Sequence, residues 1–515
     1  MNFIHYLGSR GISKAGLSLS ALLLAACGSS TEPEPPLGDR RLSVMVVAID
    51  SLMPDEIGPG TPNLSRLKEE GTFFPESRAV FSAETIPNHV AMMTGVYPRR
   101  SGIVANNFLD FEDPQKPVDR NLSRPGDLDA YSAFTWIDRQ CRRTGVNPEI
   151  RSAATLSKPY LFEVFSGNAT DGSTGRPVQN VAPDTHWDPE TSPAYIGSLF
   201  EFTPDQPTMD QALAQLPEAD FQFISLGSVD RFTHALGIPP RAATLATADQ
   251  QVGRLRAALE AAGRWEQTVL IVTSDHGTDV ALNPLLNGIS TQPMLDSLAS
   301  CFLPMQAVQN GGTDSLYVLD QSAPPEQRQA ALTAARSCLL GAQSCSSLCP
   351  GTSRPLNADK IIGAWYTTPN PDEPDATMPT SLEAAHPRFG DLVLAADKGF
   401  KFSEPFPILG NPIPGNHGHP ATFRNTMLVS GGSPWVRRGV VVAPSIAAPG
   451  PFDRLPEQSE NVDILPTVAW LLGLRIRASD FPDGRGFDGR VLSQAFTQFG
   501  TNTTAAEPTR CGRYQ

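Results

Sequence analysis

Three short and largely apolar runs stand out along the chain. They are 43–49 (SVMVVAI), 221–226 (FQFISL) and 268–273 (TVLIVT). The runs are short and rich in β-branched side chains, which is typical of parallel strands that are covered on both faces. We therefore expect these three segments to form the centre of a buried sheet.

Helical patterns lie between and beside these runs. Segment 61–70 begins with Thr-Pro and ends just before Gly71, which are a helix start signal and a helix stop signal. The spacing of apolar residues predicts further helices over 209–216 and 241–262, and a terminal helix near 462–474. Strands that alternate with helices favour an α/β fold with a doubly wound sheet and helices on both faces.

Two stretches interrupt this alternation. Segment 108–220 is rich in Pro, Asp, Ser and Gly, and we interpret it as a loop-rich insert. Segment 283–386 holds most of the cysteines and one clear strand pattern at 315–320, which favours an inserted cap subdomain. The core pattern resumes at 391–395. The expected divisions are therefore a first core part 41–282, the cap 283–386, a second core part 387–497 and a loose tail 498–515.

The N-terminus has the pattern of an export signal. Arg10 and Lys14 precede a short apolar stretch that ends in Leu-Ala-Ala-Cys at Cys27, which resembles a bacterial lipoprotein signal. We expect 1–26 to be a signal peptide, Cys27 to carry the lipid and 27–40 to be a flexible tether. This predicts an exported protein that is anchored to a bacterial membrane and faces the periplasm or the cell exterior. An ordinary signal peptide with a chance cysteine is the alternative.

Charge narrows the class of partners. The net charge is −14, and residues 1–26 carry two positive and no negative side chains, so the chain from Cys27 onward is near −16. Such a balance repels polyanions, which argues against binding to nucleic acid polymers. Small phosphate substrates remain compatible, because bound metal ions can reverse the local field.

Six further cysteines follow Cys27, and an even number in an exported chain favours disulfides. They are Cys141, Cys301, Cys338, Cys345, Cys349 and Cys511. If all six pair, about 15 connectivities are open. A zinc site at Cys338, Cys345 and Cys349 is the alternative, but no histidine lies near them in the sequence.

Each of the three apolar runs is followed by an aspartate: Asp50, Asp230 and Asp275. Ligands of open α/β sheets bind outside the carboxyl ends of the strands, where these side chains should meet. With no compensating Lys or Arg expected beside their side chains, three carboxylates would repel one another unless cations lay between them. A single aspartate after a strand is more often a helix cap, and it is the set of three that favours a metal site.

Histidines strengthen this interpretation. Asp230 and His234 are four residues apart and would project from one helix face, while Asp275 and His276 are adjacent. His417 lies in a Gly-Asn-His-Gly turn that allows close approach to a site. Mixed carboxylate and imidazole ligands favour zinc over manganese or magnesium.

A candidate nucleophile lies in segment 82–95 (SAETIPNHVAMMTG). Pro87 predicts a helix that begins just past Thr85, and Gly95 is placed to end it. Taken alone, Thr85 is most simply a helix cap. A helix N-terminus also attracts phosphate, however, and a metal-bound threonine hydroxyl can act as a nucleophile.

Together these motifs resemble the alkaline phosphatase superfamily, and within it the type I phosphodiesterase/nucleotide pyrophosphatase family. The matching segments are VVAIDSLMPD, TPNLSRLKEEGTFF, ETIPNHVAMMTGVYP, SGIVANN, GSVDRFTHALG, TSDHG and GNHG. The resemblance covers about 41–107, 221–280 and 386–495, with all motifs in the family's order. It implies an alkaline-phosphatase-like fold and a phosphodiesterase that uses two metal ions and a phosphothreonine intermediate.

The resemblance also implies residue roles. One metal ion would be held by Asp50, Thr85, Asp275 and His276, and the other by Asp230, His234 and His417. Thr85 would be the catalytic nucleophile, and Asn106 would donate to a nonbridging phosphate oxygen. His89 matches the motif without being a ligand, and we interpret it as a packing residue.

Departures from the family concern the substrate. Glu84 precedes the nucleophile where some relatives have lysine, and Ile86 replaces an aromatic residue that lines their base pocket. A different phosphodiester, a phosphonate or a monoester therefore remains open. Related monoesterases add an arginine or lysine for the extra charge, and Lys158 is one candidate. Sulfatases are excluded, because Thr85-Ile-Pro-Asn lacks their nucleophile motif, and the alternative from another class is a non-catalytic, lipid-anchored binding protein.

Overall fold

The computed structural model describes residues 42–140, 150–172, 174–197, 200–281, 286–403, 414–444, 450, 452–455 and 458–497. The expected signal peptide 1–26, tether 27–40 and tail 498–515 lie outside the described residues, as do Cys27, Cys141 and Cys511. The described helices include none that is both long enough and apolar enough to cross a membrane.

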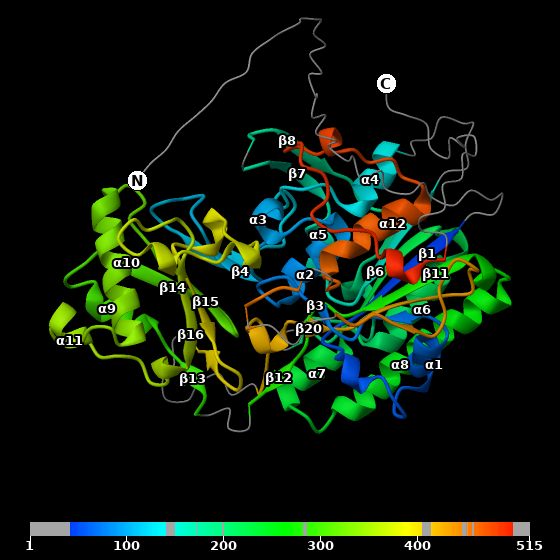
Figure 1. Ribbon diagram of the computed structural model, residues 1–515, viewed down its shortest axis with the longest axis horizontal. Helices are drawn as coiled ribbons and strands as arrows, with labels where there is room; N and C mark the ends of the chain where they lie inside the picture. The colour runs from blue at the N-terminus through cyan, green and yellow to red at the C-terminus, as the bar shows by residue number, and fades with distance from the viewer. Residues whose placement is uncertain are drawn as a thin grey trace, which may run out of the picture. The chain divides into compact units, whose positions relative to one another are not determined.

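A large sheet forms the core of the described residues, and β1 lies at its centre (Figure 1). β1 (Ser43–Ile49) pairs in parallel with β10 (Phe221–Leu226) on one side and β11 (Thr268–Thr273) on the other. These are the three strands expected from the apolar runs, with the expected bounds. The prediction is confirmed because each run is buried along its whole length.

Further strands extend this sheet on both sides. β6 (Ser152–Leu156) and β9 (Thr185–Trp187) continue it in parallel beyond β10. Beyond β11 the sheet continues through β21 (Met427–Ser430), which is antiparallel, to β2 (Thr72–Phe73) and β22 (Val440–Val441). The sheet is therefore mixed, with eight strands among the described residues.

The expectation that 108–220 is a loop-rich insert is partly wrong, because β6 and β9 belong to the central sheet. β6 has the sequence SAATL, whose small residues lack the strong apolar run that marks β1. Its burial comes from neighbours brought by the fold, namely β10 and helix α6 (Asp205–Gln215).

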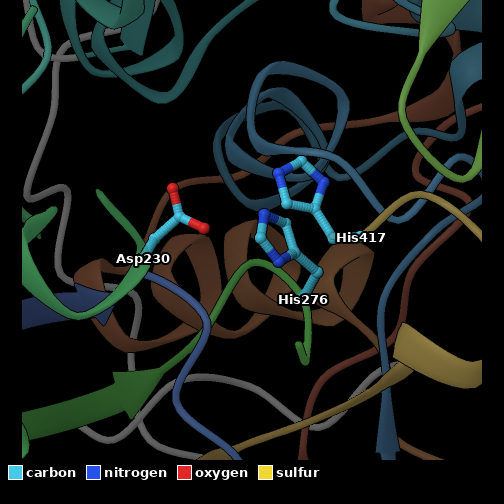
Figure 2. Close-up of side chains that lie close together, drawn as sticks. All are labelled: Asp230, His276 and His417. Atoms are coloured by element: carbon cyan, nitrogen blue, oxygen red, sulfur yellow. The ribbon is translucent and has the colours of Figure 1, made fainter. Parts of the chain in front are cut away.

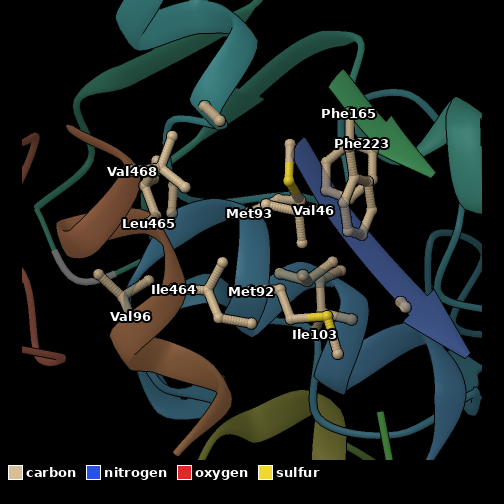
Figure 3. Close-up of a cluster of buried hydrophobic side chains, with 14 of the residues drawn as sticks. Val46, Met92, Met93, Val96, Ile103, Phe165, Phe223, Ile464, Leu465 and Val468 are labelled. Atoms are coloured by element: carbon tan, nitrogen blue, oxygen red, sulfur yellow. The ribbon is translucent and has the colours of Figure 1, made fainter. Parts of the chain in front are cut away.

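Helices cover both faces of the sheet. Alternate residues of β1 separate into two cores: Val44, Val46 and Ala48 face one, while Met45, Val47 and Ile49 face the other. The first core includes α2 (Thr85–Thr94) and α12 (Ile464–Leu472), whose side chains lie in one cluster with Val46 of β1 (Figure 3). The second includes α1 (Pro62–Glu69), α6 and α8 (Arg241–Ala261). Helices on both faces fit the expected α/β class.

Shorter elements connect this framework. The remaining helices of this part are α3 (Pro98–Ser101), α4 (Ala133–Gln140), α5 (Tyr160–Glu163) and α7 (Ser228–Leu236). Small strand pairs are β3 (Ser77–Arg78) with β20 (Arg424–Asn425), β4 (Asn107–Asp110) with β5 (Val118–Asn121), β7 (Gly167–Thr170) with β8 (Pro177–Asn180), and β12 (Asp279–Val280) with β19 (Gly415–Asn416).

A second sheet and core form within residues 286–403, which we call the cap. Its four strands, in spatial order, are β14 (Met305–Asn310), β15 (Thr313–Val318), β17 (Leu392–Ala396) and β16 (Ile361–Tyr366). Helices α9 (Gln292–Leu298) and α10 (Pro325–Leu340) lie against this sheet (Figure 1). The cap also contains α11 (Cys345–Leu348) and the parallel pair of β13 (Gly288–Ile289) and β18 (Lys401–Phe402).

The boundary expected between cap and core at residue 386 is wrong. β17 pairs with both β15 and β16, and Phe402 of β18 is buried in the same core as Ile289. The pattern of β17 resembles a core strand because it is buried on both faces, and only its pairing partners assign it to the cap.

Two disulfides lie in the cap, Cys301–Cys349 and Cys338–Cys345. They settle part of the connectivity that the sequence left open, and they exclude a zinc site at Cys338, Cys345 and Cys349, whose sulfurs are all paired. Disulfides of this kind are typical of oxidising compartments.

Candidate active site

The carboxyl edge of the central sheet gathers the three expected aspartates. Asp50 follows β1 directly, Asp275 follows β11 by two residues, and Asp230 is the third residue of α7, which begins just after β10. All three side chains are buried. The parallel order of these strands places their ends at one edge, which is why residues far apart in sequence meet there.

Two groups of potential metal ligands form at this edge. Asp50, Asp275 and His276 make one group, and Asp230, His276 and His417 make the other, with the ligand atoms of each group within 4.8 Å of one another. The His276 and His417 rings stack with centroids 3.9 Å apart, and the Asp230 carboxylate lies beside them (Figure 2). The structure thus brings the expected residues together and places His276 in contact with both groups.

His234 lies at the rim of the second group. Its Nε2 atom is 3.9 Å from Oδ1 of Asp230, and its ring centroid is 4.8 Å from that of His417. Asp230 and His234 lie one helical turn apart on α7, which is the four-residue spacing noted in the sequence. His234 is therefore placed to join Asp230 and His417 around one ion.

Several ligand atoms of this cluster have no hydrogen-bond partner in the described part of the chain. They are Asp50 Oδ1, Asp230 Oδ1, Asp275 Oδ2, His234 Nε2 and His417 Nδ1. A buried polar atom without a partner is costly, and metal coordination is one way to satisfy it. The donor set of carboxylate oxygens and imidazole nitrogens fits divalent ions such as zinc.

Neighbouring groups orient two of these ligands. Oδ1 of Asp275 accepts the backbone N–H groups of Ser51 at 3.1 Å and His276 at 3.0 Å, which leaves Oδ2 free. Nδ1 of His276 lies 2.8 Å from the carbonyl oxygen of Gly277, an arrangement in which Nδ1 carries the proton and Nε2 has a free lone pair.

The backbone of Ser51, which donates to Asp275, is strained. Its φ is 63°, an unusual value for a non-glycine residue, and Arg241 fixes its position by donating to its carbonyl oxygen.

Thr85 is the first residue of α2, with Glu84 at the N-cap position. Its hydroxyl oxygen lies 3.4 Å from Nε2 of His276 and 3.5 Å from Nζ of Lys158. Gly95 ends the helix with φ of 66°, as its position in the sequence predicted. The nucleophile candidate therefore sits at a helix N-terminus that faces the ligand cluster.

Lys158 contradicts the expectation that no cationic side chain lies beside the carboxylates. Its Nζ atom donates to Oδ2 of Asp50 at 2.5 Å and to Oδ2 of Asp230 at 3.1 Å, and the side chain is buried. Lys158 comes two residues after β6, the strand that the sequence pattern hid within the expected insert. Its place beside the aspartates follows from the pairing of β6 with β10.

One ammonium group beside three carboxylates leaves the cluster short of positive charge. Burial, followed by the nearby Asp230 and Asp275, raises the pKa of Asp50 to about 7. Burial also opposes ionisation of Asp230, but Lys158 outweighs it and holds the pKa of Asp230 well below its usual value. Burial lowers the pKa of His234 to about 4 and holds the pKa of His417 well below its usual value, so both imidazoles are neutral and able to bind a cation.

A pocket of about 590 Å³ opens beside this cluster. Thr85, Asn106, Lys158, Tyr160 and Arg231 are among the residues that line it. Oδ1 of Asn106 accepts the backbone N–H of Ile86 at 2.9 Å, which fixes the side-chain amide at the start of α2. The pocket therefore presents the nucleophile candidate, an amide donor and cationic groups to one bound molecule.

The two departures noted in the sequence do not face this pocket. Glu84 is fully buried, and its carboxylate is occupied by hydrogen bonds from the backbone N–H of Asn106 and the hydroxyl of Thr313. Ile86 packs in the main hydrophobic core. The aromatic side chain that lines the pocket is instead Tyr160, which accepts a hydrogen bond from Arg231 at 3.1 Å.

Polar residues that the sequence analysis did not single out support the site from behind. Asn88 accepts the backbone N–H of Val80 and donates to the carbonyl oxygen of Glu84, which fixes the segment before Thr85. Asn461 donates to Oδ1 of Asn88 at 3.0 Å and to the carbonyl oxygen of Asp275 at 2.8 Å. Asn88 belongs to the matching TIPNH motif, whereas nothing local in the sequence points to Asn461.

His89, interpreted from sequence as a packing residue, connects α2 to the central sheet. Its Nδ1 atom lies 2.9 Å from the carbonyl oxygen of Thr85, and its Nε2 atom lies 2.9 Å from Oγ of Ser225 in β10. His419 pairs with Asp279 at 3.1 Å and is a neighbour of the site only.

Known proteins are similar to this chain in sequence and in fold. The family model described as type I phosphodiesterase / nucleotide pyrophosphatase matches residues 44–418. Bis(5'-adenosyl)-triphosphatase ENPP4 of Bos taurus is 24% identical over 270 residues, which span 51% of this chain and 51% of that protein. The chain thus matches about half the length of this relative. Ectonucleotide pyrophosphatase/phosphodiesterase family member 3 of Rattus norvegicus is 34% identical over 88 residues, 16% of this chain and 10% of that protein.

Among solved structures, murine ectonucleotide pyrophosphatase / phosphodiesterase 5, in an inactive form in complex with AMP, has a similar fold. The TM-score is 0.57 at 16% identity, and the match covers 84% of this chain and 96% of that chain. This supports the alkaline-phosphatase-like fold expected from the sequence. Because the family model covers well over half of the chain and includes every residue of the ligand cluster from Asp50 to His417, the chain belongs to the type I phosphodiesterase / nucleotide pyrophosphatase family.

Proposed function

We propose that this protein is a metal-dependent hydrolase of phosphate esters, and first of all a phosphodiesterase, with Thr85 as its nucleophile. The observation that carries the proposal is the position of the Thr85 hydroxyl, at the N-terminus of α2 and 3.4 Å from Nε2 of His276. Around it lie buried ligand atoms without hydrogen-bond partners in the described part of the chain. A nucleophile, a cation site and a substrate pocket thus coincide.

Two divalent metal ions, zinc in our proposal, would complete the site. Asp50, Thr85, Asp275 and His276 would hold one, and Asp230, His234 and His417 the other. When bound, such ions supply Lewis-acid stabilisation of the attacking and leaving oxygens. The mixture of carboxylate and imidazole donors, and the neutral state of His234 and His417, support zinc over the harder magnesium ion.

The residues of the chain have separate roles in the reaction. The Thr85 hydroxyl releases its proton to solvent in the pocket, and its oxygen forms a bond to phosphorus as the bond from phosphorus to the ester oxygen breaks. The ester oxygen leaves and takes a proton from solvent. Water then attacks the phosphothreonine, which releases the phosphate product and restores the Thr85 hydroxyl. Lys158, 3.5 Å from the hydroxyl oxygen, favours the deprotonated form by its positive charge. The side-chain amide of Asn106 lines the pocket and donates to a nonbridging oxygen, whose charge grows during the displacement.

Nucleotide esters are the first substrates to test. One relative is named a bis(5'-adenosyl)-triphosphatase, and one similar structure holds AMP. In this chain Tyr160 provides an aromatic face in the pocket, while Ile86 is buried in the core away from it. We therefore propose that any nucleobase would stack on Tyr160.

A monoester or phosphonate substrate is the second candidate, and Lys158 favours it. A phosphomonoester carries one more negative charge than a diester, and a buried ammonium group beside the nucleophile would compensate that charge. Lys158 lies in this position, with Nζ within hydrogen-bonding distance of Asp50, Asp230 and Thr85.

The test is turnover of bis-p-nitrophenyl phosphate and p-nitrophenyl phosphate by the purified protein with and without added zinc. Thr85→Ala should abolish turnover of both while the protein still binds zinc through its other ligands. Activity retained by Thr85→Ala would contradict the nucleophile. Zinc binding with no hydrolysis of either ester would favour the non-catalytic binding protein.

We also propose that the protein is exported and anchored to a bacterial membrane by a lipid on Cys27. The lipoprotein-like sequence that ends at Cys27 supports this, and the two cap disulfides are consistent with an oxidising compartment. Incorporation of labelled palmitate into the wild-type protein, and its loss in Cys27→Ala, would test the anchor. An unlabelled wild-type protein in the soluble fraction would contradict it.

A further inference from the structure

The tip of a cap hairpin lies against the catalytic elements of the main sheet. β14 and β15 are joined by Gly311 and Gly312, and the N–H of Gly312 donates to the carbonyl oxygen of His417 at 2.7 Å. A Cβ atom on Gly312 would lie 2.4 Å from the backbone nitrogen of His419, so only glycine fits this approach. The hairpin tip is thus fitted closely to the loop that carries a metal ligand.

The same hairpin reaches the segment around Asn106. The N–H of Asn107 donates to Oδ1 of Asn310 at 2.8 Å, and Nδ2 of Asn310 donates back to the carbonyl oxygen of Asn107 at 3.0 Å. This reciprocal pair joins the end of β14 to the backbone next to Asn106. A side chain on the cap therefore fixes the backbone of the substrate-binding segment.

Glu84 is a further link between the cap hairpin and the segment around Asn106. Its Oε2 atom accepts the backbone N–H of Asn106 at 2.6 Å, and its Oε1 atom accepts the hydroxyl of Thr313, the first residue of β15, at 3.1 Å. The side chains of Glu84 and Thr313 are both fully buried. One carboxylate thus joins the residue before the nucleophile, the Asn106 backbone and the cap.

The side chain of Asn106 has little freedom in this arrangement. Its Oδ1 atom accepts the N–H of Ile86, and its backbone carbonyl oxygen accepts the N–H of Leu122 at 2.9 Å. With Oδ1 occupied, Nδ2 is the polar atom that Asn106 can offer to a molecule in the pocket, which it lines. A shift of the Asn106 backbone would move that donor directly.

We propose that Glu84 and Thr313 are positioning residues, through which the cap hairpin holds the Asn106 amide in place for the phosphate oxygen. Where some relatives have lysine before the nucleophile, this chain uses the carboxylate to join its cap to its catalytic segment. The inference rests on the role proposed for Asn106. The cap residues Gln309, Asn310 and Gly311 line the pocket, and the inference assigns to the cap a second part, which is to position Asn106.

A double-mutant cycle with Asn106 tests this inference. Thr313→Val removes the hydroxyl and keeps the side-chain shape, and we expect it to lower kcat/KM for bis-p-nitrophenyl phosphate about tenfold in the wild-type background. In the Asn106→Ala background the same change should have almost no effect, because the donor that Thr313 positions is gone. Thr313→Ser keeps the hydroxyl and should restore activity close to that of the wild type.

Thr333→Val is the matched control, since Thr333 lies on α10 of the cap, and its hydroxyl lies 3.4 Å from that of Tyr366. It should leave kcat/KM unchanged. Equal losses from Thr313→Val in both Asn106 backgrounds, or no loss in either, would overturn the positioning role. If Asn106→Ala itself had no effect, the failure would instead lie in the role proposed for Asn106, on which this inference depends.

Glu84→Gln provides a second variant in case Thr313→Val does not fold. The glutamine oxygen can accept the N–H of Asn106, and its amide can donate to the Thr313 hydroxyl, which can turn to accept it. Glu84→Gln should therefore keep most of the activity, whereas Glu84→Ala should lose about tenfold, again only when Asn106 is present. Equal activity of the Gln and Ala variants would overturn the proposal.

Discussion

The ammonium nitrogen of Lys158 lies 2.5 Å from Oδ2 of Asp50, inside the candidate active site. The two residues are 108 positions apart and meet because β6 and β1 both pair with β10. Oδ1 of Asp50 has no hydrogen-bond partner among the described residues, so this carboxylate has one oxygen for Lys158 and one for a cation. Lys158 therefore adds to the positive charge of the site without taking every ligand atom.

Replacing Lys158 by Met should separate monoester from diester hydrolysis. The extra negative charge of p-nitrophenyl phosphate loses its compensating ammonium group, so we expect kcat/KM to fall about 100-fold for the monoester and about tenfold or less for the diester. The two esters are assayed side by side in steady-state kinetics.

Lys401→Met is the control for this prediction, because Lys401 is as buried as Lys158 but lies on β18 of the cap. It should not change the ratio of the two activities. Equal losses for both esters in Lys158→Met would contradict a special role of Lys158 toward monoesters.

Removal of metal should destabilise the protein as well as inactivate it. The buried carboxylates of Asp50, Asp230 and Asp275 then lie close together, with Lys158 hydrogen-bonded to Asp50 and Asp230 and with His276 beside Asp50 and Asp275. We expect chelation to lower the melting temperature and added zinc to restore it, because an ion that binds only the folded state stabilises it. Differential scanning fluorimetry with and without chelator measures this.

Asp275→Asn should bind less zinc than the wild type, measured by atomic emission. Asp249→Asn is its control, since Asp249 is buried but accepts hydrogen bonds from Asn63 and Leu64 at the start of α1. Its zinc content should match that of the wild type. Unchanged zinc in Asp275→Asn would exclude Asp275 from the ligand set.

A buried carboxylate outside the site gives a pH dependence. Burial raises the pKa of Asp129 to about 7, although Arg388 opposes the shift. The folded state then binds a proton more tightly than the unfolded state, so this contribution to stability is present below pH about 4 and is lost as pH rises through about 7.

Asp129→Asn should remove this dependence. The wild type loses this contribution as pH rises and the variant does not. The free energy of unfolding of Asp129→Asn should therefore rise, relative to that of the wild type, by at most about 1.4 kcal/mol for each pH unit between about pH 4 and about pH 7. Urea denaturation of both proteins between about pH 4 and about pH 7, the range set by the unfolded and folded pKa values of Asp129, measures the difference. A difference that stays constant with pH would contradict the raised pKa.

The two cap disulfides should contribute unequally to stability. Cys301–Cys349 closes a span of 48 residues and Cys338–Cys345 a span of 7 residues. In the loop-entropy model, loss of the longer link costs about 4 kcal/mol and loss of the shorter link about 2 kcal/mol. Paired Cys→Ser variants of each link, compared by urea denaturation, test this order, and a larger loss from the shorter link would contradict it.

Local patterns were sufficient for much of the fold and the site. β1, β10 and β11 were expected with the bounds that the structure has, because a strand buried on both faces leaves a largely apolar run. The meeting of Asp50, Asp230 and Asp275 followed from the rule that parallel strands share one carboxyl edge. Pro87 and Gly95 predicted a helix that begins just past Thr85 and ends at Gly95, and α2 differs only in beginning at Thr85 itself, with Glu84 at the N-cap.

Other features depended on which segments become neighbours, which a local pattern does not contain. β6 has too few large apolar residues to be recognised, so Lys158 was missed as a partner of Asp50. β17 has the pattern of a core strand, and only its pairing with β15 and β16 places it in the cap.

The sequence by itself determined the central strands, helix α2 and the side chains that could bind metal, because each is marked by contiguous residues. Tertiary structure alone decided the partners of those side chains: Lys158 beside Asp50, and Glu84 joined to Thr313 across 229 positions. The physical reason is that the order in which strands pair, and the packing of the cap against the main sheet, arise from contacts between distant segments. No single stretch of sequence reveals the free energy of those contacts.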